Sequence, residues 1–312
     1  MTLPKEWARR YGVGRGTEVI VSLEADGSLR ILPPPRAGGG GGGSGWRASV
    51  RLRGDVEPEA VLRRVISFYI AGADVIEIVF DGYPRPGLVP SVRGLVSAKL
   101  LGVEVVEESA RRITFQVVGD NAMSAVEAFN RLSRTVEHML TDIAEGLRRC
   151  DQGVLREVPE RDDIVDKLFI YVWRQITSVL LGKRMPGEAG VTSYADAGIY
   201  MMAAKHIERV GDHASRIAEA AIEEPGECGE DLASAVEALT RLYREAVLYL
   251  SRPRPDGVEE VMARVNELRS RLDPRRGRVW ESARRIADYC TDILELSLNR
   301  ASVEELLASR GG

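Results

Sequence analysis

The most regular pattern of hydrophobic and polar positions in the chain lies between Tyr200 and Ala221. Apolar residues recur there at alternating spacings of three and four, which predicts one face of a helix packed in a bundle. The stripe consists of Tyr200, Ala203, Ile207, Val210, Ala214, Ile217 and Ala221. Glu208 and Asp212 lie one turn apart at its edge. Because like charges at this spacing repel by roughly 0.2–0.5 kcal/mol, we expect a compensating partner.

A second acidic pair lies beside the apolar stripe of the helix predicted before this one. Asp162 and Asp166 fall on the same rotational flank of their stripe as the first pair does of its own. If the two helices are antiparallel neighbours, the four carboxylates converge on one groove and form a site for a hard metal ion. The alternative is a solvated charged face, on which Lys205 and Arg216 pair with the acids. The spacing leaves both interpretations open.

From residue 120 onward the pattern predicts helices almost throughout. The first runs from Asn121 to Cys150 with Asp120 as its cap, and Pro159 begins or kinks the second, which continues to about Gly182. Thr192 or Ser193 caps a third helix, which ends at the Pro-Gly pair 225–226. Three more helices are predicted at roughly 231–251, 257–272 and 276–308.

The last predicted helix repeats the third. Residues 284–295 align without gaps on residues 208–219, and the apolar stripe is kept. Arg284 takes the place of the glutamate, whereas Asp288 matches the aspartate. The counterparts of the other acidic pair are Met262 and Asn266. An arginine removes a ligand and adds a repelling charge, so we expect the second bundle to keep the scaffold and to lack the site.

Two neighbours of Asp212 raise separate questions. His213 could be a further metal ligand, but Tyr289 at the matching position of the repeat favours a packing role. Gly211 costs roughly 1 kcal/mol relative to alanine inside a helix. A close approach of another helix would explain that glycine.

Residues 46–119 alternate between strands and helices. Strands are predicted at 48–52, 75–80, 103–107 and 112–118, with helices at 57–72 and 88–101, so we expect a small α/β layer. This segment has no glycine-rich phosphate loop, no Ser-His-Asp arrangement and no Cys-His pairing. Its role and its strand order stay open.

Residues 1–36 form a small unit of their own. A short helix near Leu3–Gly12 precedes a strand at 18–23, a turn at Asp26-Gly27 and a returning strand at 29–32, which Pro33–Pro35 end. Residues 37–45 are a glycine-rich linker by composition and have the look of an insert. The unit's candidate phosphate-contacting residues for DNA are Lys5, Arg9, Arg10 and Arg15. The alternative is that these side chains are solvated surface on a dimerisation module.

The amino-acid composition and net charge limit the class of protein to which this chain can belong. The 312 residues, of which 44% are apolar and 29% charged, predict two or three domains with a sizeable core. A net charge of -4 argues against a protein whose whole surface is basic and binds nucleic acid, but it allows a local basic patch. Cys150, Cys228 and Cys290 have no metal-ligand spacing, which indicates reduced thiols. Without a signal peptide or an uncharged apolar run of about 18–20 residues, we expect a cytoplasmic protein.

Residues 120–312 resemble a PhoU domain, and the phrase Glu208-Arg-Val-Gly-Asp-His213 is the most specific match. PhoU proteins regulate phosphate uptake, and their paired three-helix bundles bind multinuclear metal clusters through Glu/Asp-x-x-x-Asp motifs. Carboxylates of this kind accept iron, zinc, manganese or magnesium, and the sequence does not select among them. The resemblance implies the phosphate ABC transporter or its signalling partner as a binding partner, and a regulator rather than an enzyme. Its implied metal ligands are Asp162, Asp166, Glu208 and Asp212. A metal-dependent hydrolase and a purely structural assembly scaffold are the alternatives.

The first unit resembles the SpoVT/AbrB family of swapped-hairpin DNA-binding modules, through Leu3-Pro-Lys-x-Trp and Gly14-x-Gly-x-x-Val. Those modules are obligate dimers. In that family another strand precedes the Leu-Pro-Lys motif, and here only Met1 and Thr2 precede it, so DNA binding and dimerisation alone are equally open. The whole chain resembles an archaeal group of phosphate-uptake regulators.

The expected fold class is therefore mainly α. A PhoU-like pair of three-helix bundles, at about 120–225 and 231–308, follows a small α/β domain and a short AbrB-like swapped-hairpin β module.

Overall fold

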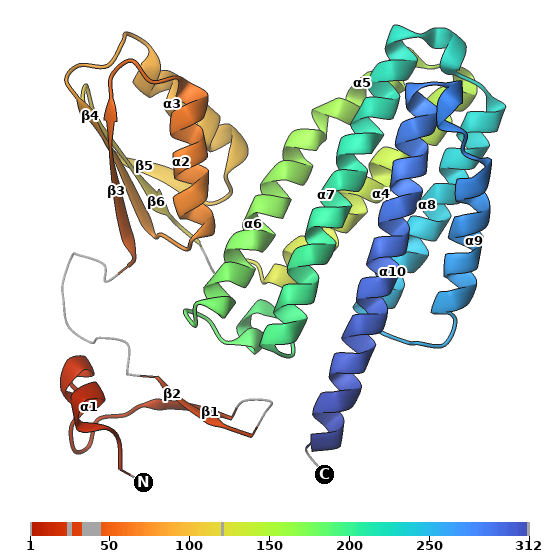
Figure 1. The fold of residues 1–312 in the computed structure, drawn as a ribbon. Coiled ribbons are helices and arrows are strands. Elements are labelled where there is room, and N and C mark those ends of the chain that lie inside the picture. Colours follow the sequence, from red (N-terminus) through yellow and green to blue (C-terminus); the bar gives the residue numbers. More distant parts are fainter. Residues whose placement is uncertain (1, 24–26, 33–44, 120–121, 311–312) are drawn as a thin grey trace. The chain divides into compact units, whose positions relative to one another are not determined.

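The computed structural model describes residues 2–23, 27–32, 45–119 and 122–310. The chain divides into two compact units, one of Met1–Gly45 with Glu304–Gly312 and one of Trp46–Val303 (Figure 1). The predicted turn at Asp26, the Pro33–Pro35 stop and nearly all of the predicted glycine-rich linker lie outside the described residues. None of the described helices has an apolar stretch long enough to cross a membrane.

The N-terminal segment consists of one short helix and a two-stranded hairpin. Helix α1 (Lys5–Tyr11) ends at Gly12, whose φ of 66° is a left-handed conformation that suits glycine. Strands β1 (Ile20–Leu23) and β2 (Leu29–Leu32) pair antiparallel, and β1 begins two residues later than the predicted strand. No residue of α1 is buried. The segment therefore has little core of its own.

The second unit opens with the predicted α/β layer. Its elements are β3 (Arg47–Arg53), α2 (Pro58–Ile70), β4 (Val75–Asp81), α3 (Leu88–Lys99), β5 (Val103–Ser109) and β6 (Arg112–Val117). The sheet order is β3-β4-β6-β5, with β3 and β4 parallel and the other pairs antiparallel. The helix α2 connects the two parallel strands, as a crossover of this kind requires. The strand order, which the sequence left open, is thereby established.

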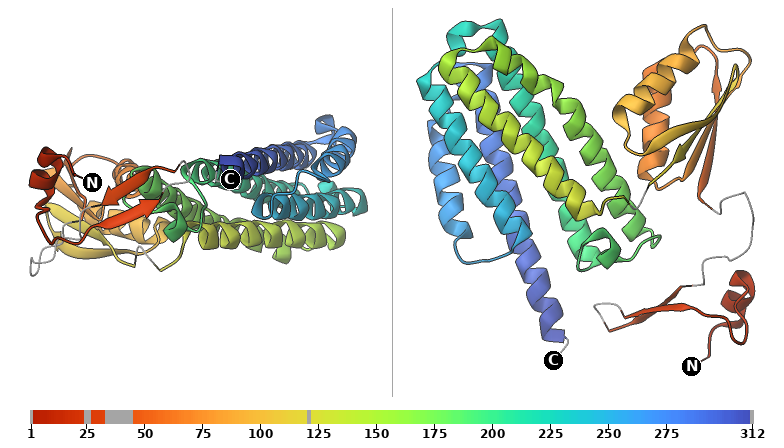
Figure 2. Two further views of the ribbon diagram at one scale, coloured as in Figure 1. Left: turned by 90° about the horizontal axis from the view of Figure 1, so that it is seen from below. Right: turned by 180° about the vertical axis from the view of Figure 1, so that it is seen from behind.

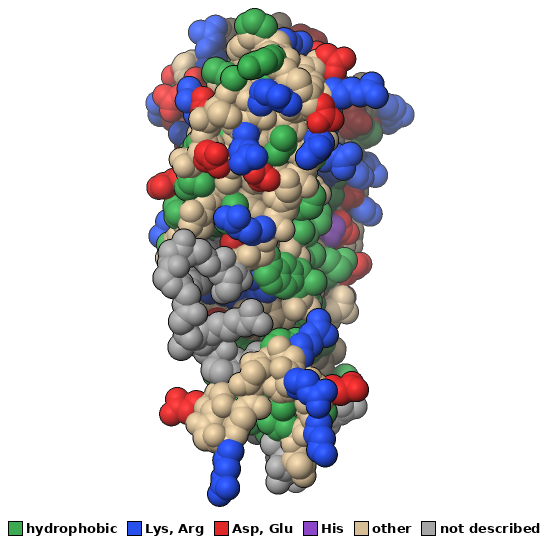
Figure 3. Space-filling model, turned by 90° about the vertical axis from the view of Figure 1, so that its left-hand side faces the viewer, with side chains coloured by type: hydrophobic (Ala, Val, Ile, Leu, Met, Phe, Trp, Pro, Cys, Tyr) green, Lys and Arg blue, Asp and Glu red, His purple; other side chains and the backbone are tan. Residues whose placement is uncertain are grey.

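The two faces of this sheet differ. Ile76, Ile78 and Phe80 alternate along β4 on a face that is completely buried beneath α2 and α3. The opposite face carries charged and polar pairs, such as Glu77 with Ser49 at 2.8 Å and with Arg112 at 3.3 Å. Figure 3 shows basic and acidic side chains interspersed over the molecule on this side.

The first helical bundle comprises α4 (Ala125–Arg149), α5 (Gln152–Glu160), α6 (Asp162–Leu180) and α7 (Tyr194–Glu223). The predicted start of α4 at Asn121 was wrong. The helix begins at Ala125 because Ser124 and Glu127 form a reciprocal capping box, and the predicted cap Asp120 lies outside the described residues. The second predicted helix is divided into two helices, α5 and α6. The helix is interrupted at Arg161, two residues after Pro159.

The second bundle comprises α8 (Glu230–Ser251), α9 (Val258–Arg271) and α10 (Arg278–Arg310). Contacts between α7 and α10 show that the two long helices run antiparallel side by side (Figures 1 and 2). Asp196 at the start of α7 pairs with Arg300 at 2.7 Å, and Glu223 at its end pairs with Arg278 at 2.5 Å. This pairing joins the two bundles, and the predicted fold class is confirmed.

Helices α4 and α8 form a second antiparallel contact between the bundles. Arg148 near the end of α4 pairs with Glu230 at the start of α8 at 3.2 Å. Nearer the start of α4, the Tyr243 hydroxyl donates to the Ser133 carbonyl at 3.1 Å.

A buried arginine joins the α/β layer to α6 within the second unit. The Arg174 side chain is completely buried and donates to the carbonyls of Tyr69 and Ala73 at 2.7 and 2.8 Å. It also pairs with Asp74 at 3.3 Å, and Lys183 reaches the same carboxylate at 3.0 Å. These contacts tie the end of α2 to the middle of α6.

Candidate functional site

The structure brings the four predicted carboxylates to neighbouring positions on two helices. Asp162 and Asp166 lie in the first two turns of α6, and Glu208 and Asp212 lie in the middle of α7. Burial and charge couple the two pairs, because Asp162 interacts electrostatically with Asp166 and Asp212, and Glu208 with Asp212. The antiparallel arrangement of α6 and α7 therefore places both pairs on one side of the helix pair.

The close approach expected at Gly211 is present. A Cβ atom added at this glycine would lie 3.1 Å from Cγ1 of Val165 on α6 and 3.4 Å from Cγ2 of Val136 on α4. Both distances are at or below ordinary van der Waals contact. The glycine thus lets α6 and α7 approach at the level of the acidic residues.

Asp162 is the carboxylate with the least compensation. Burial, together with the charges of Asp166 and Asp212, raises the pKa of Asp162 to about 6, although Lys99 and the Ser215 side chain lower it. Its Oδ1 atom is buried without a hydrogen-bond partner among the described residues. A buried oxygen without a partner destabilises the fold, so this position calls for a proton or a cation.

The other three carboxylates each pair with a basic side chain. Lys205 Nζ lies 2.7 Å from both carboxylate oxygens of Glu208. Arg209 lies 3.4 Å from Asp212 and 3.8 Å from Glu208. These two pairings are local to α7, and Arg209 rather than Arg216 is the partner of Asp212. Glu208 is buried, which the solvated-face alternative did not anticipate.

The partner of Asp166 comes from the α/β layer. Lys99, the last residue of α3, has its Nζ atom 2.9 Å from Asp166 and 2.7 Å from Asp163. The sequence analysis missed this lysine, because it lies 67 positions before Asp166 and no spacing pattern connects the two. A lysine at the end of a predicted helix carries no signal that it reaches an acidic cluster.

Carboxylate oxygens are donors that suit a hard cation, and the unpartnered Oδ1 of Asp162 adds one that is already stripped of water. In this arrangement Lys99, Lys205 and Arg209 supply the positive charge. Among the described residues, no three or more His, Cys, Asp and Glu side chains are grouped so that they could hold a metal ion. The donor atoms suit a hard cation by their chemistry, but the four carboxylates are not gathered around one point. Metal binding would require them to leave these basic side chains and to move together.

In the second bundle, the positions that match the four carboxylates of the first bundle differ in their residues or their contacts. Asp288 pairs with Arg269 at 3.2 Å and with Arg285 at 3.1 Å. Arg284 donates instead to the Leu272 carbonyl at 3.4 Å. Asn266 is exposed. Two arginines thus neutralise the acid that α10 retains.

His213 lies against α10. Its ring packs on Tyr289, the residue at the matching position of the repeat, with centroids 5.9 Å apart. Burial, together with the charges of the nearby Arg216, Arg285 and Arg209, lowers the pKa of His213 to about 4, so the ring is neutral at pH 7. This contact accounts for the packing role that the repeat suggested.

The four predicted DNA-binding residues lie on the N-terminal segment. Lys5, Arg9 and Arg10 project from α1, Arg15 follows it, and all four are exposed. Within the part of the chain that the structure describes, none of them forms an ion pair within 4.0 Å. They form a basic surface whose ligand the geometry alone does not identify.

Two family models match the chain. Residues 129–221 match the PhoU domain, and residues 1–38 match the antidote-toxin recognition domain MazE of bacterial antitoxins. Both predicted resemblances, to PhoU and to an AbrB-like N-terminal module, are confirmed. The PhoU match contains all four predicted ligands and stops before the second bundle.

Among solved structures, the crystal structure of PhoU from Pseudomonas aeruginosa is similar to this chain. The two share 21% sequence identity over 56% of this chain and 93% of the other, with a TM-score of 0.48. No curated protein matches the chain.

Proposed function

We propose that this protein is a metal-binding regulator of phosphate uptake that acts through binding and not through catalysis. The observation that carries the proposal is the PhoU-domain match over residues 129–221, which contains both acidic pairs on the adjacent helices α6 and α7. On this proposal the helical domain docks on the phosphate ABC transporter or on its signalling partner.

The proposed metal ligands are Asp162, Asp166, Glu208 and Asp212. A divalent or trivalent ion such as iron, zinc, manganese or magnesium would supply positive charge between α6 and α7. Asp162 Oδ1 has no partner to give up, whereas Asp166 would leave Lys99. Metal binding would thereby break the Lys99–Asp166 ion pair, through which the α/β layer contacts α6. The metal site and the α/β layer would be coupled in this way.

Metal content tests this proposal directly. The full-length protein, purified without a histidine tag, should contain metal by elemental analysis, and the variant Asp162→Asn/Asp212→Asn should contain little. The variant Glu259→Gln/Glu260→Gln, at exposed acids on α9, serves as the control and should keep the metal. If the wild-type protein holds no metal and no divalent ion raises its melting temperature, the acids are a charged surface and the metal proposal fails.

We further propose that the N-terminal segment dimerises. Ile20, Val21 and Leu29 of the hairpin are each at least half exposed, so the described segment leaves apolar surface uncovered. The MazE match supports a dimer in which two hairpins complete one core. Deleting residues 1–45 should lower the mass measured by sedimentation and leave the helical signal per residue intact. An unchanged oligomeric state would place the dimer contact elsewhere.

DNA is the proposed ligand of the basic surface on this segment. Full-length protein should bind duplex DNA with an affinity that falls steeply as salt rises, because phosphate contacts release counterions. Arg9→Ala/Arg10→Ala should weaken binding at every sequence tested. The control Arg241→Ala/Arg271→Ala removes two exposed arginines of the helical domain and should change little. Absence of binding at low salt would leave dimerisation as the segment's role.

A further inference from the structure

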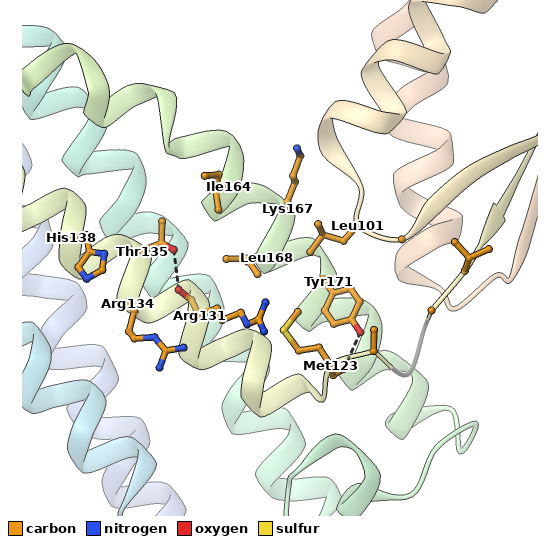
Figure 4. Close-up of a pocket in the computed structure, with 14 residues that line it drawn as sticks. Leu101, Met123, Arg131, Arg134, Thr135, His138, Ile164, Lys167, Leu168 and Tyr171 are labelled. Atoms are coloured by element: carbon orange, nitrogen blue, oxygen red, sulfur yellow. Dashed lines mark hydrogen bonds between the residues drawn. The ribbon is translucent and has the colours of Figure 1, made fainter. Parts of the chain in front are cut away.

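A second candidate site lies on the other side of α6 from the ion pairs described above. A groove of about 700 Å³ is bounded by the end of the α/β layer, the first half of α4 and α6 (Figure 4). Leu101 and Val118 contribute from the α/β layer, and all of the lining residues belong to the second unit. A volume of this size is in the range of sites for small organic ligands, about 300–1,000 Å³.

The polar side chains of this groove are all basic or neutral. Arg131, Arg134 and His138 come from α4, and Lys167 comes from α6. No Asp or Glu is among its described lining residues. In the part of the chain that the structure describes, the side chains of these four residues form no ion pair within 4.0 Å and no hydrogen bond. Arg131, Arg134 and Lys167 are like charges on the lining of one groove, and Glu127, one turn before Arg131 on α4, offsets them in part. An anion would relieve the remaining repulsion.

The rest of the groove is apolar. Leu168 and Tyr171 on α6 are buried in its wall, and Ile164 one turn earlier is 48% exposed. The Tyr171 hydroxyl donates to the Met123 carbonyl at 2.9 Å. This hydrogen bond holds the aromatic ring in the wall of the groove, beside the N-terminus of α4. A ligand for this groove therefore combines negative charge with an apolar or flat ring.

We infer that this groove binds a phosphorylated small molecule of the nucleotide class. Three cations exceed what a single carboxylate requires, and arginine pairs with phosphate oxygens through two parallel hydrogen bonds. The buried ring of Tyr171 and the side chains of Leu168 and Ile164 provide the surface for the base. The groove's volume of about 700 Å³ suits a small ligand, whereas an acidic peptide would extend along a longer surface.

The groove shares α6 with the acidic residues. Lys167 directly follows Asp166, and Leu101 lies two residues after Lys99. A ligand that binds against both segments would contact α6, which carries Asp166, and the residues that directly follow Lys99 at the end of α3. Nucleotide binding and the state of the acidic residues are therefore expected to influence each other.

Calorimetric titration of the full-length protein tests the inference. ATP, GTP, CTP and UTP are titrated separately in buffer with EDTA, so that no metal bridges them to the carboxylates. At least one nucleotide should bind, more weakly as salt rises. The nucleoside of the tightest-binding nucleotide and inorganic phosphate should each bind at least tenfold more weakly than that nucleotide. Arg131→Gln and Arg134→Gln should each lower the affinity about tenfold or more, because each removes a charge-assisted hydrogen bond.

Two further variants control for folding and location. Arg149→Gln removes an exposed arginine at the far end of α4, which pairs only locally with Glu145 at 2.8 Å, and should leave binding unchanged. Ile164→Asp places a negative charge in the exposed part of the groove and should abolish binding with an unchanged circular dichroism spectrum. The inference is overturned if no nucleotide binds with a Kd below about 1 mM. It is also overturned if Arg149→Gln weakens binding as much as Arg131→Gln, or if only a polyglutamate peptide binds.

Discussion

Single residues decide how the acidic cluster between α6 and α7 is compensated. Lys205 and Arg209 pair with acids on their own helix, whereas Lys99 reaches across from α3 to Asp166. Burial lowers the pKa of Lys99, whereas hydrogen bonds and charge from Asp163 and Asp166 raise it. The net effect is a raised pKa. Lys99 is therefore the cation that a bound metal would have to displace from outside the helix pair.

We predict that Lys99→Met increases metal affinity. The substitution keeps most of the side-chain volume and removes a charge that competes for Asp166 and repels an incoming ion. Titration with Mn²⁺ should show a dissociation constant lower than that of the wild type by severalfold or more. Because the pair is partly exposed, the metal-free protein should lose only about 1 kcal/mol of stability or less.

The matched control for this prediction is Arg93→Met. Arg93 lies on the same helix and pairs with Glu108 at 3.1 Å, away from the acidic cluster. Its replacement should leave metal affinity unchanged. Equal or weaker Mn²⁺ binding by Lys99→Met would show that the lysine does not compete with the ion.

The sequence predicted the acids and could not predict their partners. Asp162, Asp166, Glu208 and Asp212 are visible because the period of a helix repeats locally, within four residues. Lys99 and Arg174 act across more than 60 positions, where only the tertiary structure brings the groups together. The lack of a partner at Asp162 Oδ1 likewise depends on packing and leaves no trace in the spacing.

At the scale of elements, the helix repeat determines how the two bundles meet. The matching residues His213 and Tyr289 contact each other, as expected for two antiparallel copies of one helix related by a local twofold. His206 reaches Asp292 at 3.3 Å on the same interface. The gap-free repeat was evident in the sequence, but a repeat does not show whether its copies touch.

Some helix boundaries were predicted correctly from local capping residues, and others were not. The predicted cap Ser193 accepts a hydrogen bond from the Asp196 amide at 3.1 Å, and α7 begins at the next residue. The start of α4 was placed too early, because the capping box of Ser124 and Glu127 was overlooked in favour of Asp120. The break at Arg161 depends on how α5 and α6 pack, which the presence of Pro159 only suggests.

We predict that two glycines of α7 respond differently to alanine. Gly198 has no atom within 4 Å of an added Cβ, so Gly198→Ala should stabilise the protein by up to about 1 kcal/mol through helix propensity. Gly211→Ala gains the same propensity but meets Cγ1 of Val165 at 3.1 Å, so most or all of the gain should be lost. Urea denaturation of both variants measures the difference. Equal stabilisation at the two positions would mean that α6 moves away from α7 at no cost.

At the scale of the whole second unit, a few buried charges hold the α/β layer on the helical domain. The Arg174 side chain has no exposed surface and donates hydrogen bonds to two carbonyls at the end of α2. The Asp74 carboxylate forms ion pairs with both Arg174 and Lys183. Burying a charge is favourable only when its hydrogen bonds are satisfied, which is the case here. The order of the segments was readable from the sequence, but this connection was not.

We predict that Arg174→Met is strongly destabilising. The change leaves the carbonyls of Tyr69 and Ala73 without their buried donor and removes a charge partner of Asp74. The loss should be roughly 3 kcal/mol or more in chemical denaturation. As a comparison, Arg244→Met removes an exposed arginine that pairs with Glu137 at 2.7 Å and should cost about 1 kcal/mol or less. Similar losses for the two variants would mean that Arg174 contributes no more than a surface ion pair.

The two bundles share a scaffold, and their acidic residues are compensated differently. In the first, Asp162 Oδ1 is buried without a partner among the described residues, and the charges of Asp166 and Asp212 act on its carboxylate. In the second, Arg269 and Arg285 already neutralise Asp288. The protein as a whole should therefore bind metal asymmetrically, although both halves fold alike.

This asymmetry gives the last prediction. Adding Mn²⁺ to EDTA-treated protein should stabilise the fold by RT ln(1 + [L]/Kd), about 2.7 kcal/mol at a hundredfold excess over Kd, because only the native state holds the ligands together. Asp212→Asn should remove most of the bound metal and most of the thermal shift. Asp288→Asn should keep both, since the arginines around Asp288 repel a cation. If both variants lose metal equally, or anomalous scattering locates an ion beside Asp288, the two bundles bind metal alike and the arginines move aside to admit it.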